Sequence, residues 1–498
     1  MDASQYVSEV VNSLRTLGLT TRRDCLKALV KTAVFAPAVL SSRKAAGGAP
    51  LPPLPDLPES EAVLLTQADK RFARYEVAYN SRTILQPKLR ALCKTQNAVA
   101  AMVRWVRLHH IPFALRSGGH CLENFSESDS VVIDTRLMNA IKIDTADETV
   151  TTGPGASLGK LYRAVGARGY ALSAGSCPTV GVAGHALGGG YGYLSRQLGL
   201  LCDGLELIEL IDADGRALVA DSQQNVDLFW ASRGGGGGSF GVATEFRFRL
   251  FPLSKVLVFT KQCSLPPAHA LTILKAWQVW APQAPDAITS TLIIGPGAKE
   301  NVRLECAGQS VGSEDQLRRE LRRLPELGGA RGAAPKIKSM SFLQAVNYFS
   351  EGWRYRSTYA KGKSDILFDP LNEDGIGVLL AAVRKMPKNN FSLILYPYGG
   401  AIARTPPQET AFVHRTAWGC AQYDLTWDKG EKTPMRLVQL RMLYDSMRPY
   451  VSGGAYVNYC DTELPNWRES YWGANLPRLE AIKSRFDPDN VFHHAQSI

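Results

Sequence analysis

The sequence predicts an α+β fold divided into two lobes, and three observations carry this prediction. The chain has 498 residues, which is too long for one ordinary hydrophobic core. Residues 83–250 alternate short strand-like runs with helical ones, whereas beyond Pro252 the pattern changes to long amphipathic helices and longer strands. Hydrophobic residues make up 45% and charged residues 21%, as in ordinary globular domains, so neither disorder nor a fibrous repeat is indicated.

The first 50 residues differ in character from the rest of the chain. Arg22 and Arg23 precede an apolar segment at 28–40 that is too short to span a bilayer, so no integral membrane span is predicted. This order is typical of a twin-arginine export signal, and export to the periplasm or the exterior is the favoured interpretation. The alternative is an amphipathic N-terminal helix on a cytoplasmic protein, which Lys31 within the apolar segment supports.

Residues 51–82 are expected to form a linker and an N-terminal helix, since a proline-rich stretch at 50–55 separates the leader from the globular body. The first lobe is assigned to residues 83–252. Apolar residues at helical spacing predict helices at 98–110 and 157–168. Strands are predicted at 112–115, 131–134, 140–144, 149–153 and 242–250, with a hairpin at 205–220.

The second lobe is assigned to residues 253–450. Helices are predicted at 267–283, 313–325, 341–350, 374–385 and 434–444. Strands are predicted at 256–263, 288–294, 390–396 and 419–427. The closing segment, 451–498, is expected to return to the first lobe.

Charge and cysteine content limit the kinds of partner. The net charge is +11, but Lys and Arg are dispersed with no long basic run, so no nucleic-acid partner is predicted. The nine cysteines form no CxxC pair and have no zinc-like spacing, and the two His-His pairs have no nearby carboxylates at ligand spacing. Neither a metal site nor a disulfide framework is therefore predicted.

Two glycine-rich segments stand out in the first lobe, Arg116-Ser117-Gly118-Gly119-His120 and residues 177–192, CPTVGVAGHALGGGYG. A histidine behind two glycines, and a cysteine leading a glycine run, predict a backbone that lies closely around a flat anionic ligand with a nucleophilic side chain at each end. A third glycine run, 153–160, matches neither the dinucleotide fingerprint nor the phosphate-binding loop, because its glycine spacing differs and no Ser or Thr follows Lys160.

Five motifs in order carry a resemblance to a known family. They are RSGGH at 116–120, the 177–192 segment, DLFW at 227–230 followed by Arg233 and five glycines, YVNYCD at 456–461, and FDPDNVF at 486–492. Together they resemble the berberine-bridge-enzyme-like flavoproteins of the vanillyl-alcohol oxidase and p-cresol methylhydroxylase superfamily. The resemblance runs from about residue 84 to the C-terminus, and it implies an FAD lobe built from both ends of the chain plus a substrate lobe with a large antiparallel sheet.

The resemblance implies a covalently held FAD. His120 would bond the flavin 8α-methyl group and Cys177 the flavin C6 atom. Val180 would stand beside flavin C4a, where a small side chain admits oxygen and a leucine closes access. The other residues implied at the cofactor are Arg116, Ser117, Gly118, Gly119, Gly181, Gly184, His185, Gly188, Gly189 and Asn458.

The family motif also implies the catalytic groups. Tyr459 would remove a hydroxyl proton while the adjacent carbon gives hydride to the flavin, and it needs help because a free phenol has a pKa near 10. Tyr456 and Asn458 are candidate partners. On strand 419–427, alternation places Cys420 and Gln422 on one face, and Gln422 is the predicted substrate-facing group.

Two points on that strand stay open. The position matched to Cys420 is a glutamate in the plant bridge-forming members, so its absence argues against alkaloid ring closure; the alternative register makes Asp424 the acidic helper. Aromatic residues either line a substrate groove or pack the lobe, and they are Trp353, Tyr355, Tyr359, Tyr396, Tyr398 and Trp427.

The favoured function is an FAD-dependent oxidase that removes hydride from an alcohol carbon of a sugar, an oligosaccharide or a secondary metabolite and reduces O2 to H2O2. Valine rather than leucine at position 180 favours an oxidase. The alternative within the class is a tailoring dehydrogenase or oxidase acting on an aromatic or polyketide-like substrate. From a different class, the chain is a basic binding protein for acidic polymers with no redox role.

Overall fold

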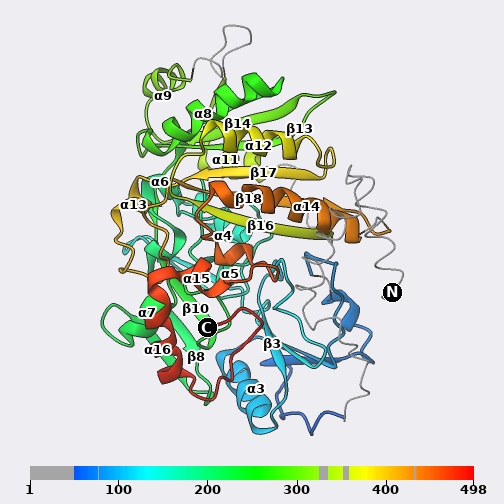
Figure 1. Ribbon diagram of the computed structural model, residues 1–498. Helices are drawn as coiled ribbons and strands as arrows, with labels where there is room; N and C mark the ends of the chain where they lie inside the picture. Colours follow the sequence, from blue (N-terminus) through cyan, green and yellow to red (C-terminus); the bar gives the residue numbers. More distant parts are fainter. Residues whose placement is uncertain (1–49, 77, 325–334, 351–357, 431–432) are drawn as a thin grey trace, which may run out of the picture.

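The computed structural model describes residues 50–76, 78–324, 335–350, 358–430 and 433–498, which form two lobes stacked one above the other (Figure 1). The predicted export signal at 1–50 therefore lies outside the described residues except for Pro50. No helix in the described ranges combines the length and the apolar character that crossing a bilayer requires.

A four-stranded sheet forms the N-terminal part of the lower lobe. Its strand order is β1-β2-β4-β3, with bounds Ala62–Thr66, Leu89–Cys93, Val131–Asp134 and Phe113–Arg116. Helix α3 (Gln96–Leu108) packs its apolar side on this sheet, and the Thr95 side chain caps it by accepting a hydrogen bond from the Ala98 N–H group. Because β3 ends at Arg116, the RSGGH turn leaves the sheet at the end of a half-buried edge strand.

The helix expected within 51–82 is wrong. The described residues of this stretch form strand β1, antiparallel to β2, and a single 3-10 turn at Phe72–Arg74. The run Ala62–Thr66 (AVLLT) pairs along its whole length with β2, and this pairing between segments about 27 positions apart outweighs local helix preference.

A five-stranded antiparallel sheet completes the lower lobe. Its order is β5-β6-β10-β8-β9, with bounds Ile141–Asp144, Thr149–Thr152, Val242–Arg249, Leu205–Ile211 and Ala217–Asp221. The predicted hairpin is confirmed, and the Asp212 carboxylate closes its turn by accepting from the backbone N–H groups of Asp214 and Arg216. Further elements here are α4 (Leu158–Gly166), α5 (Val182–Leu187), α6 (Ser195–Leu198), α7 (Val226–Ala231) and the short pair β7 (Tyr170–Ala171) and β11 (Phe251–Pro252).

The upper lobe is built on a seven-stranded sheet in which every neighbouring pair is antiparallel. Its order is β15-β12-β14-β13-β17-β18-β16, with bounds Lys336–Ser341, Lys255–Leu265, Val302–Ser310, Ile288–Pro296, Phe391–Pro397, Gly419–Trp427 and Tyr359–Leu367. The smaller helices of this lobe are α9 (Glu314–Leu321), α11 (Phe342–Ser350) and α13 (Ala401–Arg404).

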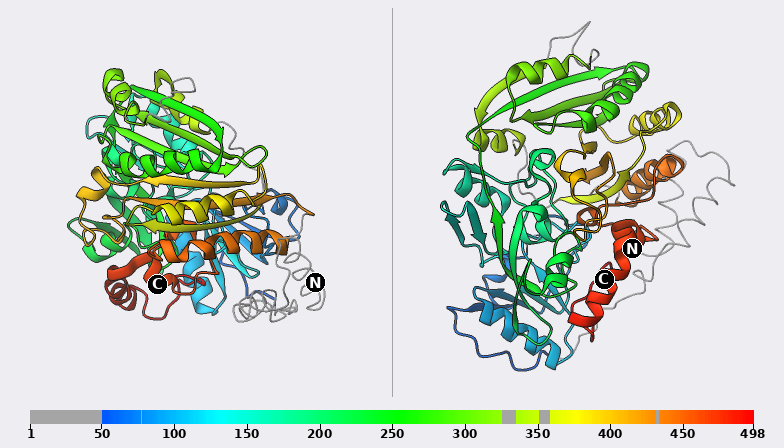
Figure 2. Two further views of the ribbon diagram at one scale, coloured as in Figure 1. Left: turned by 45° about the horizontal axis from the view of Figure 1, so that its top comes forward. Right: turned by 90° about the vertical axis from the view of Figure 1, so that its left-hand side faces the viewer.

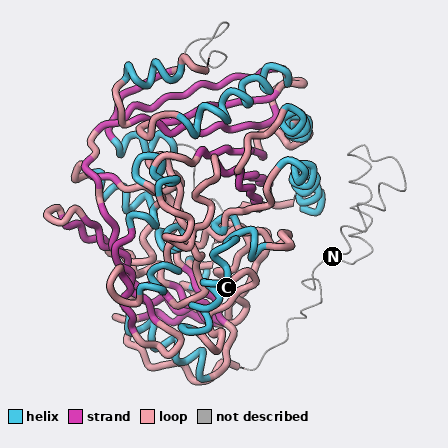
Figure 3. The backbone as a smooth tube through the Cα atoms, turned by 60° about the vertical axis from the view of Figure 1, so that its left-hand side comes forward, coloured by secondary structure: helices cyan, strands magenta, loops and turns pink. Residues whose placement is uncertain are grey.

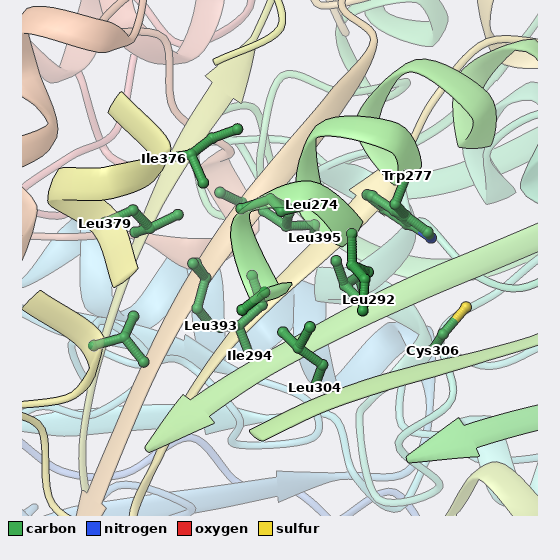
Figure 4. Close-up of a cluster of buried hydrophobic side chains, with 14 of the residues drawn as sticks. Leu274, Trp277, Leu292, Ile294, Leu304, Cys306, Ile376, Leu379, Leu393 and Leu395 are labelled. Carbon is green, nitrogen blue, oxygen red and sulfur yellow. The ribbon is translucent and has the colours of Figure 1, made fainter. Parts of the chain in front are cut away.

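Three long helices cover one face of this sheet (Figure 2), and they are α8 (Pro267–Gln283), α12 (Glu373–Val383) and α14 (Thr433–Met447). Leu274 and Trp277 of α8 and Ile376 and Leu379 of α12 interleave with strand residues in the lobe's main core (Figure 4). The opposite face of the sheet turns toward the lower lobe, and strand β18 shows this division residue by residue. Tyr423 and Leu425 lie in the core, whereas Gln422 and Asp424 face the lower lobe.

The C-terminal segment returns to the lower lobe, as predicted, and the chain ends there (Figure 3). Helix α15 (Trp467–Trp472) and helix α16 (Leu476–Phe486) pack on that lobe, with α16 against α7. The buried Lys483 ammonium donates to the Ser239 and Phe492 carbonyls and pairs with Asp487 at 2.7 Å. The C-terminal segment is thus held to the lower lobe by the Lys483 ammonium, whose charge and hydrogen-bond donors all have partners.

A buried ion network joins the lobes. Lys361 and Lys363 of strand β16 both contact the Asp461 carboxylate, and Lys361 also contacts Glu123 of the lower lobe. The two lysines hold the pKa of Asp461 well below its usual value despite burial, so this carboxyl is charged. Asp461 is therefore held in place only two residues from Tyr459.

Candidate functional site

One cavity of about 390 Å³ lies where the two lobes meet. The lower lobe contributes most of its wall, through the RSGGH turn, the segment around Cys177 and the glycine run near Gly237. The C-terminal segment contributes Val457–Cys460, and the upper lobe contributes side chains from the open face of its sheet. Of the predicted site residues, those that line this cavity are Arg116, Ser117, Gly118, Gly119, His120, Cys177, Val180, Gly181, Gly184, His185, Gln422, Asn458 and Tyr459.

The two glycine motifs are packed back to back. A Cβ atom on Gly118 would lie 2.3 Å from the Gly181 nitrogen, and one on Gly181 would lie 2.6 Å from the Gly118 nitrogen. Gly119 has φ +68° and sits directly over the Arg116 guanidinium. These glycines are therefore required by the close approach of two backbones, which sets the distance between the His120 turn and the Cys177 turn.

His120 is a partly buried, neutral imidazole. Burial, and then the neighbouring Arg116 guanidinium, lower its pKa to about 4. Its ring stacks on Tyr79 with the ring centroids 4.8 Å apart. Arg116 is itself buried and pairs with Glu127, so the charge beneath the turn is compensated.

Cys177 begins the turn that leads into α5. Its Sγ atom lies 3.5 Å from the Thr179 hydroxyl, and the Val180 N–H group donates to the Cys177 carbonyl. The Val180 carbonyl accepts from the Leu158 N–H group at 2.9 Å. The thiol and the Val180 side chain are thus fixed on the same cavity wall by backbone hydrogen bonds.

Helix α5 presents Gly184 and His185 to the cavity. No atom lies within 4 Å of the place where a Gly184 Cβ would stand, so the wall is open there. The His185 Nε2 atom accepts a hydrogen bond from the Gly175 N–H group at 2.9 Å, and burial lowers the pKa of the ring to about 4. The neutral ring therefore carries its proton on Nδ1.

Three predicted residues support the site from behind. The Tyr456 hydroxyl accepts from the Gly190 N–H group at 2.9 Å and from the Asn458 amide at 2.8 Å, and it does not line the cavity. Gly188 lies against the Asn458 side chain, where a Cβ would come within 2.1 Å of its Oδ1 atom, and Gly189 has φ +119°. The predicted catalytic position of Tyr456 and the predicted cofactor contacts of both glycines are therefore corrected to positioning roles.

A chain of hydroxyl groups crosses the cavity between the lobes. Tyr459 donates a hydrogen bond to Tyr396, and Tyr396 donates to the Gln422 Oε1 atom at 3.0 Å. Burial raises the pKa of both phenols well above 10, so each keeps its proton in this arrangement. Gln422 and the neighbouring Asp424 come from alternate positions of β18, so both the predicted residue and its alternative face the site.

Asp424 is the carboxyl group among the described residues that line the cavity. Burial raises its pKa to about 6, and the ion pairs found in the described chain do not include it. It acts electrostatically on Tyr79 and Tyr396, raising the pKa of each phenol. A carboxyl group that ionises near neutral pH in a cleft is a candidate for proton transfer.

Only one of the described groove aromatics lines the cavity. Tyr396 does so, whereas Tyr398 and Trp427 are buried in the hydrophobic cores and Tyr359 packs against Trp427. Trp353 and Tyr355 lie outside the described residues. Most of the described aromatic residues therefore pack within the lobe and do not line a substrate groove.

Sequence reasoning missed several lining residues. The five glycines at 234–238 were part of a family motif but were not assigned to the site, and residues 235–238 line the cavity; Gly234, Gly236 and Gly238 have positive φ. His494 stacks on Phe125 at 4.7 Å and contacts the Gly237 carbonyl through Nε2. Five consecutive glycines were a usable signal for close backbone approach; Tyr79, Tyr191 and Tyr193 gave none.

Comparisons with known proteins agree with this geometry. Residues 87–221 match the family described as FAD binding domain, and residues 455–498 match the family described as berberine and berberine like. The FAD-linked oxidoreductase YgaK of Bacillus subtilis is 32% identical over 87% of this chain and 96% of its own length. Berberine bridge enzyme-like 25 of Arabidopsis thaliana is 31% identical over 89% of each chain.

Solved structures give the same result. BBE-like 1 of Physcomitrella patens matches with a TM-score of 0.82 and 28% identity, over 88% of this chain and 96% of that one. Berberine bridge enzyme from Eschscholzia californica matches with a TM-score of 0.79 and 28% identity over the same shares. The fold is thus the two-lobed α+β flavoprotein fold of the p-cresol methylhydroxylase type, and the class is FAD-linked oxidoreductase.

The chain belongs to the berberine bridge enzyme-like family. The interpretation as a binding protein without redox function has no support from these relatives.

Proposed function

We propose that this protein is an oxidase that binds FAD covalently through His120 and Cys177, removes hydride from an alcohol carbon and reduces O2 to H2O2. The observation that carries the proposal is the cavity itself, which brings both anchor side chains together with the hydroxyl chain of Tyr459, Tyr396 and Gln422. Electrons and protons balance, since the alcohol loses two electrons and two protons and O2 takes up both pairs.

The cavity residues fit FAD. A neutral imidazole keeps a lone pair for bond formation, and the low pKa of His120 keeps it neutral at physiological pH. The open wall at Gly184 and the glycine run near Gly237 leave room for a flat ring system close to the backbone. When bound, FAD supplies the hydride acceptor and the site of reaction with O2.

The hydroxyl chain supplies proton handling. A substrate hydroxyl beside Tyr459 gives up its proton as the carbon loses hydride, and Tyr459, Tyr396 and Gln422 are already hydrogen-bonded in series. Asp424 faces the same space with a pKa of about 6, so it is the cavity carboxylate that is ionised at neutral pH. We assign proton acceptance to the Tyr459 hydroxyl, with Asp424 as the acidic helper that the alternative register of this strand indicated.

A substrate with an aromatic ring is the second candidate. Tyr79, Tyr193 and Tyr396 line the cavity and can stack on an aryl ring. One relative, 30% identical over 89% of this chain, is named monolignol oxidoreductase AtBBE-like 13. Sugars and oligosaccharides stay in the proposal, because aromatic side chains beside polar ones such as Gln422 can bind them as well as they bind aryl rings.

Two measurements test the proposal. Purified protein should be yellow, and the colour should stay with the polypeptide after acid precipitation; H120A and C177A should each retain flavin through the remaining bond, whereas the double variant should release it. Flavin that is freed from the unaltered protein by acid would refute covalent attachment. A panel of sugars and phenolic alcohols, assayed for peroxide, then decides between the two substrate classes, and no peroxide with any alcohol that reduces the flavin would refute the oxidase.

A further inference from the structure

Two thiols face each other inside the cavity. The Sγ atoms of Cys121 and Cys460 lie 3.6 Å apart, although the residues are 339 positions apart in the chain. Cys121 directly follows His120, and Cys460 directly follows Tyr459. Both cysteines line the same cavity as those two residues.

We propose that Cys121 and Cys460 form a redox-active dithiol that hydrogen peroxide converts into a disulfide within the cavity. The link to turnover rests on the proposed function, because an oxidase would release peroxide at these thiols. The disulfide would join the turn that carries one predicted flavin anchor to the segment that carries the proposed proton acceptor.

The chemistry balances in two steps. The Cys121 sulfur attacks one peroxide oxygen, so an S–O bond forms, the O–O bond breaks and one water leaves, giving a sulfenic acid. The Cys460 sulfur then attacks the Cys121 sulfur, so an S–S bond forms, the S–O bond breaks and a second water leaves. Two thiols and one H2O2 give one disulfide and two H2O, and peroxide is the oxidant.

The groups around each sulfur decide which thiol attacks peroxide and which thiol then forms the disulfide. The Phe125 N–H group donates to the Cys121 Sγ atom at 3.3 Å, and hydrogen bonds from Cys460 and from this backbone lower the pKa of Cys121 despite burial. Its neighbour Cys121 and burial raise the pKa of Cys460. Cys121 is therefore the attacking thiol, and Cys460 is the resolving thiol.

Formation of the disulfide needs only a small movement of the two sulfur atoms. A disulfide has an S–S length of about 2.05 Å, so the two sulfurs must approach by about 1.5 Å from their present 3.6 Å. Asp461 is held firmly, because its backbone N–H donates to the Tyr471 hydroxyl, its carbonyl accepts from Gln496 and its carboxylate pairs with buried lysines. The turn that follows Cys121 is tied as well, because Glu123 pairs with Arg82 and Lys361. The sulfurs therefore approach through small adjustments of the two cysteine side chains.

The test uses the flavin-loaded protein and two oxidants. Samples treated with reagent H2O2 or with diamide are alkylated and digested without reduction, and mass spectrometry should find a peptide pair linked through Cys121 and Cys460 that dithiothreitol separates. C121S and C460S should give no linked pair, and C460S should accumulate a dimedone-reactive sulfenic acid at Cys121. C263S, which changes a cysteine on strand β12 of the upper lobe, is the matched control and should form the link as the unaltered protein does.

Oxidation should also raise the thermal midpoint by a few degrees in the unaltered protein and in C263S, since the bond closes a long loop, and the midpoint should not move in C121S or C460S. If neither H2O2 nor diamide links the two peptides, the inference is overturned whatever the enzyme does. If reagent peroxide links them while turnover with an oxidisable alcohol yields no peroxide, the dithiol is supported and the proposed oxidase activity fails.

Discussion

Replacing Asp424 by asparagine should stabilise the folded protein at neutral and alkaline pH. The Asp424 carboxyl faces the cavity, and burial raises its pKa from 3.8 to about 6 in the folded state. Between these two values the folded protein binds more protons than the unfolded chain, so the free energy of unfolding falls as pH rises from about 4 to about 6. The charged Asp424 therefore destabilises the fold above pH 6, and asparagine removes that cost.

The magnitude follows from the size of the shift. A difference of about two pKa units, at about 1.4 kcal/mol per unit, gives an upper value of about 3 kcal/mol. Because the side chain lines a cavity that water can enter, we expect about 1–3 kcal/mol. The assay is unfolding of the flavin-loaded protein between pH 4.5 and pH 8, with D424N compared with the unaltered chain.

The expected curves converge near pH 4.5 and separate by pH 7, with D424N the more stable protein. The matched control is D489N, which removes an exposed carboxylate paired with Arg107 and should change stability by no more than about 0.5 kcal/mol at any pH. Curves for D424N that run parallel to those of the unaltered protein over the whole range would refute the assignment of a raised pKa to this carboxyl.

Four further predictions concern the site. D461N should cost about 3–5 kcal/mol in thermal or urea unfolding, because it leaves two buried lysines facing an uncharged amide. G118A should lower the free energy of unfolding by about 1–3 kcal/mol and reduce the flavin content, because its Cβ would lie 2.3 Å from the backbone of Gly181. In the control G184A the Cβ would meet no atom within 4 Å, so stability should change by less than about 1 kcal/mol. V180L should slow flavin reoxidation by O2 about tenfold, equivalent to about 1.4 kcal/mol, and leave anaerobic reduction unchanged in stopped-flow traces; equal O2 rates would contradict it. The kcat/KM of the unaltered enzyme should rise with pH through about 6, and D424N should lose that limb.

Local pattern was sufficient for much of the fold. The helix at 267–283 and the strand at 419–427 have the bounds that were predicted, and the hairpin predicted at 205–220 ends one residue later, because each carries its own periodicity and its own flanking turn residues. Strand β16 (Tyr359–Leu367) was not predicted, since its sequence, YAKGKSDIL, reads as a polar loop. Its lysines are buried only because Glu123 and Asp461, about 100 or more positions away, supply the compensating charges.

The site residues also fall into those that a local motif indicates and those that depend on contacts between distant segments. The motifs indicated His120, Cys177 and Tyr459 because each lies in a short segment whose residue types and order are distinctive. The hydrogen bond between Tyr459 and Tyr396 and the facing thiols of Cys121 and Cys460 depend on how the lobes meet, and no spacing within one segment encodes that. Both contacts exist only in the folded chain.

The hydroxyl chain sets a direction for the proton. Tyr459 donates to Tyr396, and Tyr396 donates to the Gln422 oxygen, so neither phenol is a ready base while that order holds. A proton taken by Tyr459 from a substrate can be accommodated only if its own proton passes along the chain or to the carboxylate of Asp424, which lines the same cavity. Asp424 is ionised above its pKa of about 6 and lies next to Gln422 on the cavity face of β18, where it can offset the positive charge that moves through the chain. The raised pKa of this carboxyl costs stability, but it makes the ionised group a better proton acceptor than an ordinary aspartate while leaving it charged at neutral pH.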